Sequence, residues 1–289
     1  MITSNQDILV STKSQRHMAI IQLVSTALLW SMGGLLIKWV QWNPIAIAGM
    51  RSALAAILML IFCRPLKFHW SFAQVGGMVS YAATVILFVS ANKMTTAANA
   101  ILLQYTAPIY VAVFSGWFLK EKITKLDWLT IAITMVGMFL FFQDNITVGG
   151  FWGNMVAIAS GVAFASLVLF TRMQKDGSSL ESLFLGNILT AVIGLPFMLG
   201  VMPSVQSWIG LLLLGFFQIG LSYILFAKAL KHLTALEGIL IPIIEPVLNP
   251  IWVFFLLGEK PGPWAIIGGL VILVAVTTRC VIVALRQNS

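Results

Sequence analysis

Glu245 is an acidic residue in the middle of a long apolar segment, and two neighbouring residues share its helical face. Asn249 and Trp252 follow at spacings of four and three residues, which places the three side chains in one stripe. A charged group inside a membrane helix costs about 3 kcal/mol and is usually kept for function. We therefore interpret Glu245 as a group that binds a proton and a cationic ligand in turn. A carboxyl group that stays neutral and only packs helices together is the alternative.

Three prolines interrupt the same segment, at Pro242, Pro246 and Pro250. Each lacks an amide hydrogen and leaves the carbonyl four residues earlier without its helical donor. The segment is therefore predicted to be bent near Glu245, with free carbonyls beside the carboxylate, which suits a ligand site. A kink that serves only the shape of the helix is the alternative.

A second break is predicted at Pro108, where Gln104 lies four residues earlier and Tyr105 adjoins it. Other polar or aromatic side chains lie within apolar segments, where a polar group facing lipid would be wasteful: Trp30, Tyr81, Gln218, Ser222 and Tyr223. We expect several of them to line a common cavity with Glu245. Each could instead join two helices by a hydrogen bond or anchor at the membrane interface.

Arg51 lies about seven residues inside another apolar segment, deeper than easy snorkelling explains. It needs an acidic or carbonyl partner, and Glu245 is one candidate. If Arg51 merely snorkels, its replacement by Gln should not disturb folding.

The elements that must position these residues are membrane-spanning helices. Apolar residues make up 60% of the 289 residues and charged residues 9%, the reverse of a soluble domain. Each apolar run of 18 or more residues can cross a hydrocarbon core of about 30 Å, and the alternating segments of a membrane β-barrel are missing from the sequence. The ten predicted spans are residues 18–40, 44–63, 70–91, 97–119, 126–143, 150–172, 180–200, 206–230, 235–257 and 263–285. The predicted fold class is an all-α polytopic membrane protein.

The charge distribution predicts the orientation. The net charge is +8, but the 17 Lys and Arg residues cluster at helix ends and do not form a surface for nucleic acid. With the N-terminus inside, thirteen of them fall at inner ends and three, Lys38, Lys93 and Lys260, at outer ends. Because basic loops stay in the cytoplasm, both tails, residues 1–17 and 286–289, are predicted to be cytoplasmic.

Missing motifs exclude several function classes. The sequence contains no GxxxxGK[ST], HExxH or GxSxG motif, which argues against nucleotide hydrolysis and against an enzyme. His17, His69 and His232 have no Cys or carboxylate at ligand spacing, so we expect no metal and no cofactor. Cys63 and Cys280 lie at predicted cytoplasmic ends, where thiols stay reduced.

The chain also contains an internal repeat. A shift of 138 residues lays residues 86–122 over 224–260 without a gap, and thirteen of the 37 positions are identical. The matches include polar and proline residues that shared apolar composition does not explain: Lys93 with Lys231, Thr96 with Thr234, Pro108 with Pro246, and Glu121 with Glu259. We infer two repeats of five helices, residues 18–143 and 144–285. Because five is odd, the second repeat is inverted relative to the first, which is typical of transporters. Glu121 and Glu259 are expected to be solvated charges at helix ends.

These features resemble the EamA-type family of the drug/metabolite transporter superfamily. The resemblance rests on the five-plus-five repeat, on a fourth helix in each half that carries Pro and ends in Glu, and on Glu245-Pro246-Val247 followed by Leu257-Gly258-Glu259. It covers nearly the whole chain after residue 17. In the first half Lys120 replaces a preferred Gly and Ala107 stands opposite Glu245, so ion chemistry should concentrate in the second half.

The resemblance implies a central cavity lined by the first, third and fourth helices of each half, with the fifth and tenth helices at the periphery. Family members move amino acids, other small metabolites or drugs, commonly outward.

We therefore expect a secondary active transporter of a small polar metabolite, an amino acid or a related amine-bearing compound. It would cross the inner or plasma membrane by alternating access, as a proton-coupled exporter. The alternative is an uncoupled exchanger or facilitator of a larger metabolite or drug, with Glu245 binding the substrate itself. The expected partners are the substrate, the lipid bilayer and a proton or exchanged solute, without nucleic acid. A homodimer through the small residues Ala265 and Gly269 is the less favoured arrangement.

Overall fold

The computed structural model describes residues 5–62, 68–143, 150–177, 179–200, 202–248 and 262–286, without the side chains of 5–13, 98 and 286. Every regular element in these ranges is a helix. The elements are α1 (Asn5–Trp30), α2 (Gly33–Trp39), α3 (Pro44–Phe62), α4 (Phe72–Met94), α5 (Ala97–Gln104), α6 (Ala107–Phe118), α7 (Lys125–Phe142), α8 (Phe151–Met173), α9 (Ser179–Met198), α10 (Val205–Leu212), the π-helix η1 (Leu213–Leu221), α11 (Ser222–Ala229), α12 (Ala235–Leu240), the 3-10 helix η2 (Ile241–Ile244) and α14 (Pro263–Arg286).

The predicted all-α membrane fold is confirmed. Nine candidate spans are found among the described residues: Ser14–Trp39, Pro44–Phe62, Phe72–Met94, Asn99–Phe118, Lys125–Phe142, Phe151–Met173, Ser179–Met198, Val205–Ala229 and Pro263–Leu285. Their bounds agree with the predicted spans to within about four residues. The remaining predicted span, 235–257, is described only as far as residue 248.

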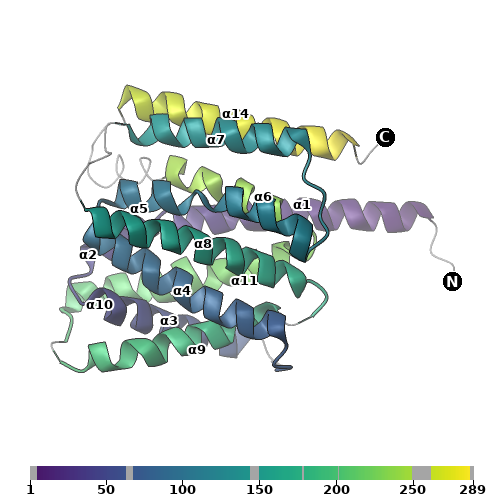
Figure 1. Cartoon of the computed structure of the whole chain (residues 1–289). Helices are drawn as coiled ribbons and strands as arrows, with labels where there is room; N and C mark the ends of the chain where they lie inside the picture. The colour runs from purple at the N-terminus through teal and green to yellow at the C-terminus, as the bar shows by residue number, and fades with distance from the viewer. Residues whose placement is uncertain are drawn as a thin grey trace.

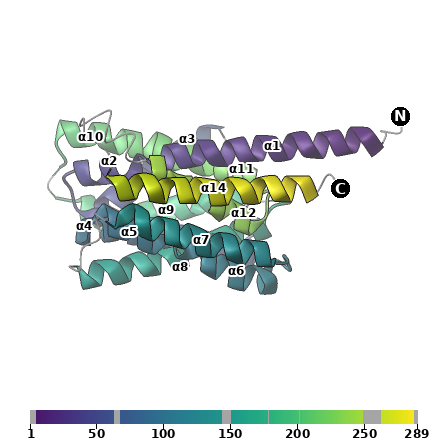
Figure 2. The same ribbon diagram turned by 90° about the horizontal axis from the view of Figure 1, so that it is seen from above.

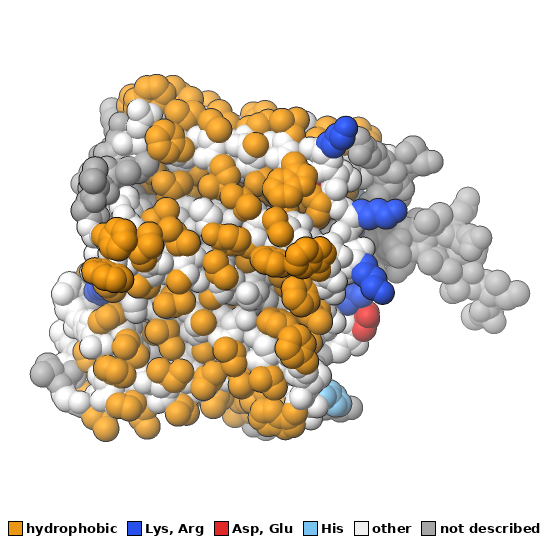
Figure 3. Space-filling view, viewed as in Figure 1, with side chains coloured by type: hydrophobic (Ala, Val, Ile, Leu, Met, Phe, Trp, Pro, Cys, Tyr) orange, Lys and Arg blue, Asp and Glu red, His pale blue; other side chains and the backbone are white. Residues whose placement is uncertain are grey.

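The helices form a bundle with both termini at the same end, beyond which α1 projects (Figures 1 and 2). On the face seen in Figure 3, hydrophobic side chains cover the area between the two ends, and most of the visible Lys and Arg gather at the end that holds the termini. An apolar belt between charged ends is the surface of an integral membrane protein.

The pair α7 and α14 lies along one edge of the bundle (Figure 1), the peripheral position that the resemblance implied. The two helices pack closely because Gly268 has no side chain, and a Cβ there would lie 2.3 Å from the backbone nitrogen of Phe141. A Cβ on Gly269 would meet Val247 and Phe141 of the same chain. This part of the small-residue face therefore packs inside the protein, which gives no support to a dimer through Gly269.

Serine and threonine side chains begin several of these helices. Ser71, Thr96, Thr124, Ser204 and Thr234 each accept a hydrogen bond from the backbone amide three residues later. Such N-caps satisfy amides that the helix itself leaves free, and they fix the residue at which each helix starts.

Four spans depart from α-helical geometry in their interior, and these departures position the site. The first span is interrupted between α1 and α2, and the fourth between α5 and α6 just before Pro108. The ninth of the ten predicted spans, 235–257, tightens into η2, where Pro242 is the second residue. The eighth widens into the π-helix η1, a form that often marks functional sites.

Candidate functional site

A small cavity lies among the interrupted spans. It has a volume of about 40 Å³ and is lined by Trp30, Arg51, Thr84, Val85, Phe88, Gln104, Phe164, Gln218, Ile219, Tyr223 and Glu245. These residues come from both halves of the chain. A cavity of this size holds about three water molecules and is too small for a metabolite, so it would have to widen to admit one.

Glu245 follows η2 and is 9% exposed. Its Oε2 atom accepts a hydrogen bond from the Tyr105 hydroxyl at 2.6 Å, and that hydroxyl also lies 3.1 Å from the Pro242 carbonyl oxygen. Tyr105 occupies the break between α5 and α6. The interrupted fourth and ninth spans therefore meet at this hydrogen bond.

Helix α8 packs closely against the break between α5 and α6 because residue 161 is a glycine. A Cβ on Gly161 of α8 would lie 2.8 Å from the Gln104 carbonyl oxygen. Gln104 itself donates from Nε2 to the Ser160 hydroxyl at 2.7 Å. Helix α8 therefore approaches the break more closely than any larger residue at position 161 would allow.

Arg51 of α3 is 2% exposed and forms no ion pair with Glu245, although both residues line the cavity. Its Nη1 atom donates to Oε1 of Gln218 at 3.1 Å, and Nη2 lies 3.5 Å from the Val85 carbonyl oxygen. Its Nε atom is buried without a hydrogen-bond partner. A carbonyl is one of the two partner types expected for Arg51, but the nearer acceptor is a neutral amide, and the candidate partner Glu245 does not pair with it.

The π-helix η1 carries Gln218 into the cavity. The next residue after η1 is Ser222, whose hydroxyl accepts a hydrogen bond from Trp30 Nε1 at 2.8 Å and donates to the Gln218 carbonyl. The interruption after Trp30 brings Gly33 so close that a Cβ there would lie 2.9 Å from Gln218 Nε2. Backbone irregularities in the first and eighth spans therefore place the Gln218 amide.

Aromatic rings form one wall of the site. The Trp30 ring centroid lies 5.1 Å from that of Tyr223 and 5.6 Å from that of Phe164. Tyr81 packs edge-on against Tyr223 at 4.8 Å, and its hydroxyl donates to Asn187 at 2.8 Å. Ring faces beside a cavity can stabilise a cation.

Comparison with known proteins identifies the family. The sequence model of the EamA-like transporter family matches the chain twice, at residues 17–143 and 151–278. The chain belongs to the EamA-like transporter family. The double match is consistent with the internal repeat, and the expectation that the protein is no enzyme agrees with this membership.

Relatives across distant organisms carry transporter names. An uncharacterized transporter of Archaeoglobus fulgidus is 25% identical, covering 88% of this chain and 93% of its own. Solute carrier family 35 member G1 of Homo sapiens is 26% identical, covering 85% of this chain and 74% of its own. A solved crystal structure superposes with a TM-score of 0.78 at 17% identity, over 94% of this chain and 99% of that one, which shows a shared fold.

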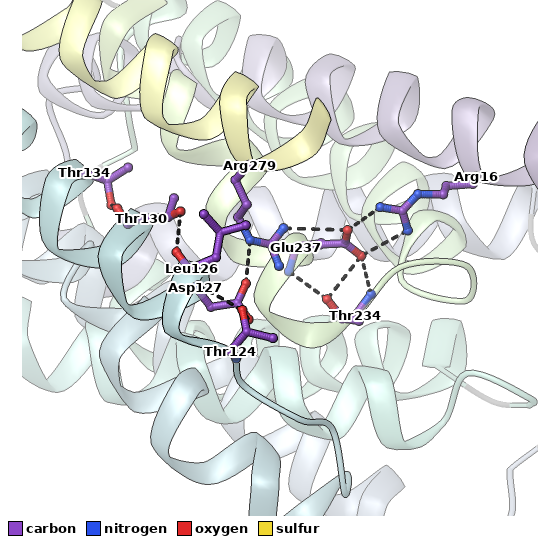
Figure 4. Close-up of polar contacts among 9 residues, drawn as sticks. All are labelled: Arg16, Thr124, Leu126, Asp127, Thr130, Thr134, Thr234, Glu237 and Arg279. Atoms are coloured by element: carbon purple, nitrogen blue, oxygen red, sulfur yellow. Dashed lines mark hydrogen bonds and ion pairs between the residues drawn. The ribbon is translucent and has the colours of Figure 1, made fainter. Parts of the chain in front are cut away.

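In this EamA-like transporter a network of buried charges lies at the end of the bundle that holds both termini (Figure 4). Glu237 of α12, 1% exposed, pairs with Arg16 of α1 and lies 3.7 Å from Nη1 of Arg279. Arg279 of α14 also pairs with Asp127 of α7 at 2.8 Å. Glu237 and Asp127 additionally form the capping boxes of their helices with Thr234 and Thr124.

A separate ion pair lies at the same end. Glu121 accepts from Arg172 Nε at 2.8 Å and from the backbone amide of Ala235, at the start of α12, at 3.0 Å. The expectation that Glu121 is a solvated end charge is therefore wrong, because it binds two groups of the second half. Each of the pairs Arg16–Glu237, Asp127–Arg279 and Glu121–Arg172 joins the first half of the chain to the second.

The structure brings most of the predicted site residues together. The cavity is lined by six of them: Trp30, Arg51, Gln104, Gln218, Tyr223 and Glu245. Three others contact lining residues: Tyr81 packs on Tyr223, Tyr105 donates to Glu245, and Ser222 accepts from Trp30. Asn249, Pro250 and Trp252 lie outside the described residues. Pro246 falls in the helical residues 245–248, directly after Glu245.

Five lining residues were missed by sequence reasoning: Thr84, Val85, Phe88, Phe164 and Ile219. They are ordinary residues of apolar helices, and only the spatial order of the helices shows which face points inward. The threonine at position 84 is the one polar signal among them.

Proposed function

We propose that this protein is a secondary active transporter that exports a small polar, amine-bearing metabolite by alternating access. In this proposal Glu245 exchanges the cargo for a proton. The supporting observation is the position of Glu245, a carboxylate buried at the break of the ninth span, lining the cavity and hydrogen-bonded to Tyr105 of the other repeat.

Competition between the proton and the cargo for Glu245 would couple their movements across the membrane. A buried carboxylate is poorly solvated when, as among the described residues, one hydroxyl group donates to it, and either a proton or an ammonium group would neutralise it. The two cannot occupy the carboxylate together, so binding of one releases the other. The rings of Trp30 and Tyr223 beside the cavity favour a cationic amine as the competing group.

The small cavity and the ion pairs between the halves suggest how access could alternate. The three ion pairs between the halves lie at the end that the excess of basic residues assigns to the cytoplasm. At the opposite end the described hydrogen bonds between the halves include neutral ones from Gln41 to Ser207 and from Thr95 and Asn99 to Asn154. Breaking the Arg16–Glu237 and Glu121–Arg172 pairs would open the cavity to the inside, and breaking the neutral contacts would open it to the outside, whereas Asp127–Arg279 joins the two peripheral helices α7 and α14.

Transport by purified protein in liposomes tests the proposal. A panel of labelled amines and amino acids is offered with and without a pH gradient, and the gradient is expected to accelerate uptake in the wild type. The variant Glu245→Gln should lose this acceleration, whereas Asp176→Asn, which removes an exposed carboxylate, should keep it.

Gradient-driven transport by Glu245→Gln at the wild-type rate would overturn proton coupling at this residue. The uncoupled exchanger or facilitator would then be the better description. If the wild type exchanges cargo for cargo at a rate that does not depend on the pH gradient, the same conclusion follows.

A further inference from the structure

Arg51 is a buried cation that has no anionic partner among the residues the structure describes. It is 2% exposed, and its two hydrogen-bond acceptors are the neutral Gln218 amide and the Val85 carbonyl. A guanidinium group has five donors, and a charged one buried in a protein is normally paired with an acid. None of the ion pairs among the described residues includes Arg51.

One edge of the guanidinium group is left available. Gln218 occupies Nη1, whereas Nε is buried with no partner and Nη2 lies at the 3.5 Å limit of a hydrogen bond. Nε and Nη2 form the side of the group that binds a carboxylate through two parallel hydrogen bonds. The available atoms are therefore those that a carboxylate requires.

The position of Arg51 is fixed by tight backbone packing. Helix α3 lies so close to η1 that a Cβ on Gly215 would be 3.0 Å from the Arg51 carbonyl oxygen and 2.5 Å from the Leu54 Cβ. The side chain itself is 2% exposed, is hydrogen-bonded to Gln218 and lines the cavity, so its charge lies in the cavity wall and not at the membrane surface. The alternative that Arg51 snorkels is thus disfavoured.

The cavity therefore presents two opposite charges that are not paired with each other. Arg51 is held by Gln218, and Glu245 is held by Tyr105. We propose that Arg51 binds the carboxylate of the cargo while Glu245 binds its ammonium group, so that the cargo is an amino-acid-like zwitterion. This inference rests on the proposed function and narrows the substrate class. The 40 Å³ cavity must widen to admit such a molecule, as alternating access would allow.

Ligands that share a side chain but lack either the carboxylate or the amine can test the Arg51 contact and the Glu245 contact separately. Leucine and phenylalanine are each compared with the amine that lacks the carboxylate, 3-methylbutylamine or phenethylamine, and with the acid that lacks the amine. Binding is measured by thermal shift of the purified full-length protein and by competition in liposome transport. The wild type should bind at least one of the two amino acids about tenfold or more tightly than the matched amine or acid.

Substitution of Arg51 should remove only the contribution of the carboxylate. In Arg51→Gln the affinity for the amino acid should fall about 10- to 100-fold, the loss of a charge-assisted contact, while affinity for the matched amine stays unchanged. Arg51→Lys should restore part of the preference, since it keeps the charge but lacks the two-donor edge. If Arg51→Gln fails to fold, the comparison of ligands on the wild type decides by itself.

Equal affinity of the wild type for the amine and the amino acid would overturn the role of Arg51 and leave the proposed function intact. An equal loss of amine and amino-acid binding in Arg51→Gln would also overturn it. By contrast, failure of every amine-bearing ligand to bind, together with unchanged transport by Glu245→Gln, would overturn the proposed function itself.

Discussion

Replacing Glu237 by Gln should open the cavity at the end of the bundle that holds both termini. The substitution keeps the size of the side chain and an oxygen for the Thr234 cap, but it removes the charge that Arg16 and Arg279 share. Breaking a buried ion pair costs about 3 to 5 kcal/mol. We take about 3 kcal/mol, the lower bound, because Arg16 is partly exposed and Arg279 keeps Asp127.

This energy is lost only by conformations that contain the network. If the halves separate when the cavity opens inward, about 3 kcal/mol shifts the ratio of open to closed conformations about 100-fold. An inward-open population of about 1% would then rise to about half.

Thiol labelling can measure the shift. The reporter is Val85→Cys, in the cavity wall, placed in a chain in which Cys63 and Cys280 are replaced by Ser. An impermeant reagent is applied to each side of sealed vesicles. Labelling from the side on which the termini lie should rise steeply when Glu237→Gln is added, and labelling from the other side should fall.

Asp127→Asn provides the matched control, because it also removes a buried carboxylate from the network but weakens mainly the contact between the peripheral helices α7 and α14. It should lower the melting temperature with little effect on labelling. If Glu237→Gln lowers the melting temperature and leaves the labelling of position 85 unchanged, the network is a permanent scaffold and the reasoning about a gate is refuted.

Two further substitutions test the geometry around the broken helices. Tyr105→Phe removes the donor to Glu245 and should lower proton-driven transport about tenfold or more, the value of one hydrogen bond to a charged group, while the melting temperature in detergent changes little. Gly161→Ala places a methyl group 2.8 Å from the Gln104 carbonyl oxygen, so α8 must move away from the break at a cost of about 1 to 3 kcal/mol. A clear loss of thermal stability is expected for Gly161→Ala, and Gly177→Ala, with nothing within 4 Å, should have the wild-type melting temperature.

The spans and the repeat could be read from the sequence because the bilayer imposes them. A helix that crosses a hydrocarbon core must be long and apolar, whatever its neighbours are, so hydropathy alone located nine spans to within a few residues. The bends near Pro108 and Pro242 were expected for a similarly local reason, since proline cannot donate to the helix.

Features that depend on distant neighbours could not be read in this way. The π-helix η1 contains no proline, and its close contacts are with Gly33 and α3, far away in the sequence. Arg279 was counted among the basic residues that set topology, whereas it is 5% exposed and pairs with Asp127, 152 residues away. Sequence patterns report local geometry and membrane depth, but they do not report which helices are neighbours.

The hydrogen bond between Tyr105 and Glu245 joins a hydroxyl group of the first half to a carboxylate of the second. This asymmetry bears on how proton and cargo movement could be coupled. Under the 138-residue shift Glu245 matches Ala107, so the first half has no carboxylate at the equivalent position and instead supplies the Tyr105 hydroxyl to Glu245. A hydrogen bond between the repeats must change when one repeat moves against the other. Opening the cavity should therefore alter the surroundings of Glu245 directly, and the same motion that exposes the cargo would favour its exchange for a proton. A symmetric pair of carboxylates, by contrast, would repel each other across the cavity in every closed state.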